Sequence, residues 1–168
     1  ALTVSGITVA DREYNQTTDA TVDYSNASLS GVIENDDLSI DSITAAFADK
    51  NAGVDKAVQL TAEYKGEDAD NYIIDNQATA TATITPKQMI VSGLQAEDKV
   101  YDGLLDASID VSQVELDGLF VGDVVKVSAT GVFDDKNIGE DKKVTLSTLY
   151  SGVDHENYRE SNLAQRIE

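Results

Sequence analysis

Apolar and polar residues alternate along several short segments of the chain, which is the pattern of strands that bury one face and expose the other. Val125, Val127 and Ala129 are separated by single polar residues, and Val144 and Leu146 repeat the alternation shortly afterwards. Threonine and branched aliphatic residues are frequent in these segments, and both favour a pleated strand over a helix. The pattern predicts a chain built from short strands.

The chain also repeats itself. Residues 2–7 (LTVSGI) return as residues 89–94 (MIVSGL), and residues 47–53 (FADKNAG) return as residues 133–139 (FDDKNIG). Because such matches occur in one order along both halves, they indicate a tandem duplication.

The predicted boundary between the two copies falls at Pro86, after the Ala/Thr-rich segment at residues 78–85. The junction carries no Gly or Ser run, so we expect it to be short and stiff. This gives a first module at residues 1–87 and a second at residues 88–168, arranged end to end. The second copy reaches only into the counterpart of the Ala/Thr-rich segment, so its last strand is expected to be incomplete.

Both copies must adopt one fold, and this requirement decides an ambiguous segment. Residues 43–47 would suit a helix, but the equivalent residues 130–133 contain a glycine and β-branched residues, which favour a strand. The Lys-Asn-x-Gly segments at residues 50–53 and 136–139 predict turns, since Asn and Gly tolerate a positive φ. The sequence therefore predicts an all-β chain of two tandem antiparallel β-sandwich-like modules. A β-grasp-like elongated sheet with one short helix is the alternative.

The chain is strongly acidic, with 12 Lys and Arg residues against 31 Asp and Glu residues and a formal net charge of -19. Such a surface repels phosphate backbones and anionic lipid. The chain has no cysteine and no apolar run long enough to span a membrane. We therefore expect no nucleic-acid partner, no membrane insertion and a monomer whose partners are the neighbouring modules of the same chain.

A repeated pattern places oxygen-bearing side chains on alternate residues around a glycine. The candidate calcium ligands are Asp49, Asn51 and Asp55 in the first copy and Asp135, Asn137 and Asp141 in the second. Carboxylate and amide oxygens are the ligands that this hard cation prefers. The spacing is not that of an EF-hand, whose glycine comes one position later and whose bidentate Glu is missing here. A plain hairpin turn without an ion is the alternative, and no other cofactor is expected.

Candidate catalytic residues are few. His155 is the only histidine, and the first copy has Ala69 at the matching position, so the general base of a hydrolytic triad is missing there. Paired carboxylates such as Asp134 and Asp135 are interpreted as solvated turns rather than as glycosidase acids. The duplication also argues against catalysis, because active sites are rarely built twice in adjacent small modules. We therefore expect the chain not to be an enzyme.

Four tyrosines occupy matching positions in the two copies, namely Tyr14 and Tyr101, and Tyr72 and Tyr158. They would form either an aromatic platform for a sugar or part of the packing. A tyrosine at a fixed place in a β module more often buries its ring and bonds its hydroxyl to a loop, and we expect this role.

The repeated motifs also resemble those of a known family. They are Tyr-Asp-Gly at residues 101–103, Leu-Asp-Gly at 116–118, Asn-Tyr at 157–158 and Ile-Thr-Pro-Lys at 84–87. In these motifs the chain resembles the YDG-type repeat of large bacterial adhesins and haemagglutinin-like exoproteins. The first copy departs from the name motif, with Tyr-Asn-Gln at residues 14–16.

The resemblance implies a secreted protein, located outside the cell at the bacterial cell surface, with a role in cell adhesion and biofilms. It implies that such modules extend a stalk and that no catalytic residues are present. We therefore expect a structural spacer that projects a distal binding domain. The alternative is an adhesin module that itself binds a glycan or a host protein, through an exposed patch shared by both copies.

Overall fold

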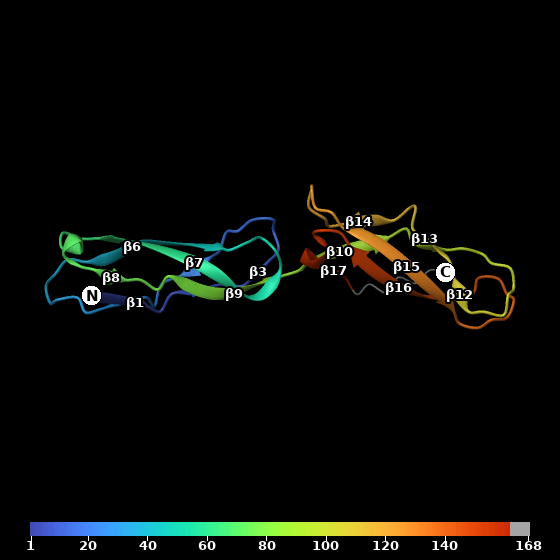
Figure 1. Cartoon of the computed structure of the whole chain (residues 1–168), viewed down its shortest axis with the longest axis horizontal. Helices are drawn as coiled ribbons and strands as arrows, with labels where there is room; N and C mark the ends of the chain where they lie inside the picture. The colour runs from blue at the N-terminus through green and yellow to red at the C-terminus, as the bar shows by residue number, and fades with distance from the viewer. Residues whose placement is uncertain (162–168) are drawn as a thin grey trace. The chain divides into compact units, whose positions relative to one another are not determined.

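The computed structural model describes residues 1–161 and divides the chain into two compact units, Ala1–Thr85 and Pro86–Glu168. We call these units the first and second module. The sequence prediction placed their boundary after Lys87. Strands are the main secondary structure of both modules (Figure 1). The expected incomplete final strand falls on residues 162–168, outside the described part of the chain.

The first module begins and ends with strands. Its elements are β1 (Leu2–Ser5), β2 (Thr8–Val9), β3 (Arg12–Glu13), β4 (Val22–Asp23), β5 (Ser28–Ser30), β6 (Ser39–Phe47), β7 (Gly53–Lys65), the 3-10 turn η1 (Ala69–Asn71), β8 (Ile74–Asp75) and β9 (Thr79–Thr85).

One layer of the first module is a four-stranded sheet in the order β3-β9-β7-β6. Strands β6 and β7 form a long antiparallel hairpin, in which Phe47 lies opposite Val58. Strand β9 lies antiparallel to β7 on one side and parallel to β3 on the other. It is therefore an inner strand, although it is the last strand of the module.

The other layer contains a three-stranded sheet in the order β5-β1-β8 and the two-stranded pair β2-β4. Leu2 and Val4 of β1 are buried and the residues beside them are exposed, as the alternating pattern predicts. Val4, Ile7 and Ile43 form a buried cluster, against which apolar side chains of β4 to β8 pack. Full burial of one such aliphatic side chain contributes about 1.5–3 kcal/mol. The core therefore lies between two layers, as in a sandwich.

The second module repeats most of this arrangement. Its described elements are β10 (Lys87–Ser92), β11 (Gln95–Ala96), β12 (Asp106–Ala107), β13 (Ile109–Asp110), β14 (Glu115–Asp117), β15 (Lys126–Phe133), β16 (Val144–Ser151), the 3-10 turn η2 (His155–Asn157) and β17 (Tyr158–Glu160). The sheet orders are β14-β10-β17, β11-β13 and β12-β15-β16. The bridge between β12 and β15 matches an isolated bridge between Asp19 and Ala46 in the first module. Within residues 86–161, β3 and β9 have no counterpart.

The prediction of an all-β fold is confirmed, and residues 43–47 lie in strand β6 rather than in a helix. The strand pairing is not purely antiparallel, because β1 with β8, β3 with β9, and β10 with β17 are parallel pairs. Parallel neighbours need a long crossover connection, and here most of the module forms it. No helix within residues 1–161 is both long enough and apolar enough to cross a membrane.

Two glycines of the second module hold left-handed backbone conformations in different surroundings. Gly93 follows β10 with φ +79°, and a Cβ added there would lie 2.0 Å from the carbonyl oxygen of Gln113. Gly122 has φ +95°, and a Cβ there would meet nothing within 4 Å. This pair separates the effect of backbone conformation from that of close packing.

We expect Gly93→Ala to destabilise the second module clearly more than Gly122→Ala does. A left-handed conformation alone costs a residue with a Cβ about 1–2 kcal/mol, and at Gly93 the loop backbone must also move to make room. Chemical denaturation of the two variants measures the difference. Equal losses of unfolding free energy would show that the contact with Gln113 is unimportant.

Candidate functional site

The candidate calcium ligands of the first module lie in the turn that joins β6 to β7. One carboxylate oxygen of Asp49, Oδ1, accepts hydrogen bonds from the backbone N–H of Asn51 at 2.8 Å and from the ammonium group of Lys56 at 2.6 Å. The side chain of Lys56 is only 13% exposed, whereas that of Asp49 is half-exposed. Asn51 thus donates its backbone N–H to Asp49, and the ammonium group of Lys56 supplies the positive charge beside this carboxylate.

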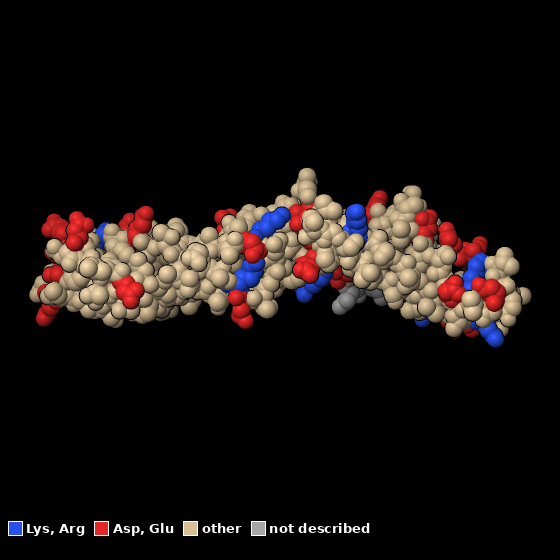
Figure 2. Space-filling view, viewed as in Figure 1, with Lys and Arg blue, Asp and Glu red and all other residues tan. Residues whose placement is uncertain are grey.

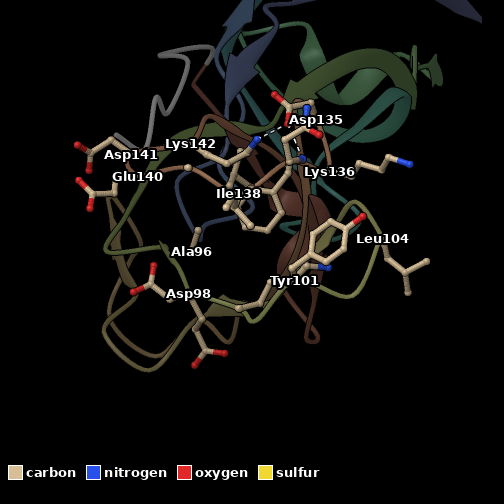
Figure 3. Close-up of a pocket in the computed structure, with 16 residues that line it drawn as sticks. Ala96, Asp98, Tyr101, Leu104, Asp135, Lys136, Ile138, Glu140, Asp141 and Lys142 are labelled. Atoms are coloured by element: carbon tan, nitrogen blue, oxygen red, sulfur yellow. Dashed lines mark hydrogen bonds and ion pairs between the residues drawn. The ribbon is translucent and has the colours of Figure 1, made fainter.

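The second module builds the same turn between β15 and β16. Oδ1 of Asp135 accepts the backbone N–H of Asn137 at 2.7 Å and the ammonium group of Lys142 at 2.5 Å. Lys142 also lies 3.7 Å from a carboxylate oxygen of Asp134, and its side chain is 16% exposed. In Figure 3 the side chain of Lys142 reaches toward Asp135. The lysine–carboxylate pair is therefore a feature of the repeat.

These contacts lower the pKa of both carboxylates. The hydrogen bond from lysine is the largest cause at Asp49 and at Asp135, followed by the bond from the backbone N–H of the asparagine. Both donors stabilise the charged form. At neutral pH the two turns are thus closed by ion pairs between near neighbours in the sequence.

The remaining two candidate ligands, Asp55 and Asp141, hold left-handed conformations with φ 49° and 50°. The turns expected at the Lys-Asn-x-Gly segments are present, but the positive φ falls on these aspartates rather than on Asn or Gly. Residues 1–161 contain no group of three or more His, Cys, Asp or Glu side chains that would hold a metal ion. The structure therefore does not gather the six candidate residues into ion cages, and calcium binding stays a prediction.

The Tyr-Asp-Gly segment forms a tight turn in the second module. A carboxylate oxygen of Asp102 accepts the backbone N–H of Leu104 at 2.9 Å, and Gly103 has φ +80°. The ammonium group of Lys99 lies 3.0 Å from Asp102 and 3.5 Å from Asp106. The aspartate of the motif therefore caps the turn, and the glycine supplies its left-handed residue.

The first module closes the equivalent turn with other residues. Asn15 replaces the aspartate, and its Oδ1 accepts the backbone N–H of Thr17 at 3.0 Å as well as a hydrogen bond from Arg12. Gln16 replaces the glycine and still has φ 67°. The turn conformation is therefore kept although the glycine that favours it is missing.

A third repeated feature is a tyrosine whose hydroxyl holds a loop. The hydroxyl oxygen of Tyr158 accepts the backbone N–H of Phe120 at 2.9 Å, and the hydroxyl group donates to Asp123 at 2.7 Å. The first module makes the same two bonds with Tyr72, Ile33 and Asp36. These tyrosines thus have the packing role that the sequence favoured over a sugar platform.

A comparison with protein families finds a match over both modules. The family described as YDG domain matches residues 1–82 and again residues 85–162. The chain belongs to the YDG domain family. No similar protein was found among curated proteins, and none among solved structures.

The other repeated tyrosine differs between the two YDG domains. Tyr14 is 1% exposed, its backbone N–H donates to the carbonyl of Thr85 at 2.9 Å, and the ammonium group of Lys50 lies 5.8 Å from its ring centre. Tyr101, its counterpart in the second YDG domain, is 58% exposed. The sequence analysis predicted a buried packing role for both tyrosines, and the structure buries Tyr14 but not Tyr101.

Tyr101 borders a pocket of about 530 Å³ in the second YDG domain. The pocket is lined in part by Lys99, Leu104, Ile138 and Val144, and Figure 3 shows Tyr101 and Leu104 on one side and Lys142 with Asp135 on another. The sequence pattern offered no sign of this pocket, because Val144 matches the buried Val58 and Lys142 matches Lys56, which is paired with Asp49.

Other candidate residues show no shared arrangement. Nδ1 of His155 lies 2.7 Å from the carbonyl oxygen of Gly152 and, in the tautomer that carries a proton there, donates a hydrogen bond to it. The histidine is therefore part of the loop beside η2. On the face seen in Figure 2, Asp and Glu side chains are spread over both YDG domains and are not gathered in one place. Neither the histidine nor the surface carboxylates thus form a site common to both domains.

We expect Lys142→Met to raise the pKa of Asp135 toward the ordinary aspartate value of about 3.9, because the main cause of its lowering is removed. Carboxyl NMR titration measures this. Asp110 is the internal control, since its pKa is lowered by hydrogen bonds from Ser112. In the wild-type protein the pKa of Asp135 is lower in the folded state than in the unfolded state, so the charged carboxylate stabilises the fold. This stabilisation is fully present above the unfolded pKa of Asp135 and is lost as the pH falls through its folded pKa. An unchanged Asp135 pKa in the variant would contradict the assignment.

We expect opposite outcomes for alanine at the two matching tyrosines. Tyr14→Ala removes a fully buried ring and should lower the stability of the first domain by about 3–5 kcal/mol. Tyr101→Ala removes an exposed ring and should change stability by less than about 1 kcal/mol. Denaturation followed by hydrogen exchange assigns each loss to its domain. Similar losses for both variants would mean that Tyr101 is buried in solution.

Proposed function

We propose that the two YDG domains are a structural spacer in a secreted bacterial cell-surface adhesin, where they hold a distal binding domain away from the cell. The family membership supports a repeated module, and the repeated contacts support a role that each copy performs in the same way. The lysine–carboxylate turn and the tyrosine-held loop occur in both domains with closely similar distances. These contacts stabilise the fold of each domain.

The observation that carries the proposal is the length of the junction. Strand β9 ends at Thr85 and β10 begins at Lys87, so Pro86 alone lies between the last strand of one domain and the first strand of the next. Proline fixes its own φ and restricts the residue before it. A junction without a flexible segment suits a chain that must keep its domains apart. The net charge of -19 adds repulsion that opposes self-association.

One observation favours binding as the second candidate function, namely the exposed Tyr101 at the pocket of the second domain. A glycan or host-protein site that belongs to the repeat would have to be present in both copies. Tyr14 is buried at the matching position, so the patch is not shared. We therefore place the spacer role first and include no catalytic step in the proposal.

Small-angle scattering of the chain tests the spacer role, first in calcium and then in excess chelator. We expect a rigid extended particle in both conditions, since lysine already neutralises Asp49 and Asp135. The matched control is a variant with a Gly-Ser segment inserted after Pro86, which should give a broader distribution of dimensions. Wild-type scattering as broad as that of the control would overturn the proposal. Saturable binding to a glycan array by both domains would favour the second function instead.

A further inference from the structure

The first domain contains two asparagines in the pattern Asn-x-Ser/Thr, which is the acceptor pattern for N-glycosylation. They are Asn15, which is followed by Gln and Thr, and Asn26, which is followed by Ala and Ser. Both asparagines are exposed, and so are the residues that carry the hydroxyl groups, Thr17 and Ser28. The two patterns therefore lie where a modifying enzyme can reach them.

The second domain repeats the turn around Asn15 without the acceptor pattern. Asp102 stands at the position of Asn15, and Leu104 stands at that of Thr17. Asp102 caps the turn as Asn15 does, because each side chain accepts the backbone N–H of the residue two positions later. The turn thus needs a side-chain oxygen but no amide nitrogen, so the pair of Asn15 and Thr17 is more than the fold requires.

The second pattern is also confined to the first domain. Gln113 stands at the position of Asn26, and the backbone carbonyl of either residue lies next to the glycine that follows the first strand of its domain. Glu115 stands at the position of Ser28, since the two residues have matching partners in the strand pairing. Both members of the pattern therefore differ between the domains while the backbone stays the same.

The side chain of Asn15 is held in an arrangement that suits a reaction at its amide nitrogen, Nδ2. Its Oδ1 accepts the backbone N–H of Thr17 at 3.0 Å, the hydroxyl group of Thr17 at 3.0 Å and a hydrogen bond from the guanidinium of Arg12. Donors on the oxygen draw electrons away from the nitrogen, and the charged guanidinium is the strongest of them. The protons of Nδ2 are therefore easier to remove, and none of these three bonds occupies Nδ2.

We propose that Asn15 is an N-glycosylation site and that Asn26 is a second site of lower occupancy. The hydroxyl group of Ser28 lies 3.3 Å from that of Ser5, so Asn26 lacks the arrangement found at Asn15. The donor is a sugar carried on a diphosphate. Nδ2 forms a bond to the anomeric carbon, the bond from that carbon to the diphosphate oxygen breaks with its electron pair, and one N–H proton passes to a base of the transferring enzyme. The inference goes beyond the spacer role and does not rest on it.

Mass spectrometry of the protein isolated from the cells that produce it tests the proposal. Trypsin cuts after Lys and Arg, so residues 13–50 form one peptide that contains both asparagines. Residues 100–126 form the matched control peptide, which contains Asp102 and Gln113 at the same positions. We expect the mass of one or more sugars on the first peptide and none on the control. Electron-transfer fragmentation should place the sugar chiefly at residue 15.

Variants produced in the same cells test the role of the hydroxyl group. Thr17→Val should abolish the sugar at Asn15, whereas Thr17→Ser should retain it because the hydroxyl group is kept. Thr18→Val is the matched control, since Thr18 is exposed but lies outside the pattern, and it should leave the sugar in place. Chemical denaturation of the three variants checks that the first domain stays folded.

Transfer to the unmodified chain in cell fractions identifies the carrier of the sugar. A soluble extract supplied with UDP-glucose tests a nucleotide carrier, and a membrane fraction with its own lipid-linked sugars tests a lipid carrier. Transfer to Asn15 in either fraction supports the proposal.

An unmodified peptide of residues 13–50 from the producing cells would overturn the proposal. Sugars found only on Ser or Thr side chains would overturn it as well, and so would a sugar at Asn15 that persists in Thr17→Val. Each of these outcomes leaves the scattering test of the spacer role untouched.

Discussion

The structure of the first YDG domain depends on strand β9, because this strand forms hydrogen bonds along both of its edges. It holds β3 against the sheet, buries Ile84 between the layers and offers the carbonyl of Thr85 to Tyr14. The described part of the second domain has the same hairpin, the same three-stranded sheet beside it and the same turns. It differs at residues 99–100, which form no strand, and at Tyr101, which is exposed.

Within the described residues, the two domains repeat most of one arrangement. The layer built on β10 is retained, since β10 pairs with β14 and β17 as β1 pairs with β5 and β8. The hairpin β15–β16 is retained as well. The layer built on β10 and the β15–β16 hairpin are thus the parts that the two domains share.

Much of this fold follows from the sequence, and the reasons for the exceptions are physical. The alternation of apolar and polar residues predicts the strands. The internal duplication predicts the two modules and the strand at residues 43–47. Strand direction was not predictable, because the inward–outward alternation of a strand is the same whether its neighbour is parallel or antiparallel. The acidic turns were interpreted from oxygen spacing alone, and Lys56 and Lys142 were left out of that pattern although each follows the last aspartate directly. The exposure of Tyr101 was not predictable either, because the repeat aligns it with Tyr14, which is buried.

The parallel pairing of β1 with β8 has a mechanical consequence. The first strand of the domain and a strand close to its end point the same way and share hydrogen bonds at Leu2 and Thr3. Tension applied to the two ends of such a pair slides the strands along each other, so the bonds between them are loaded together. An antiparallel hairpin pulled from its open end would break its bonds one after another. The parallel pair therefore resists stretching along the chain, and single-molecule extension would measure this resistance as a rupture force.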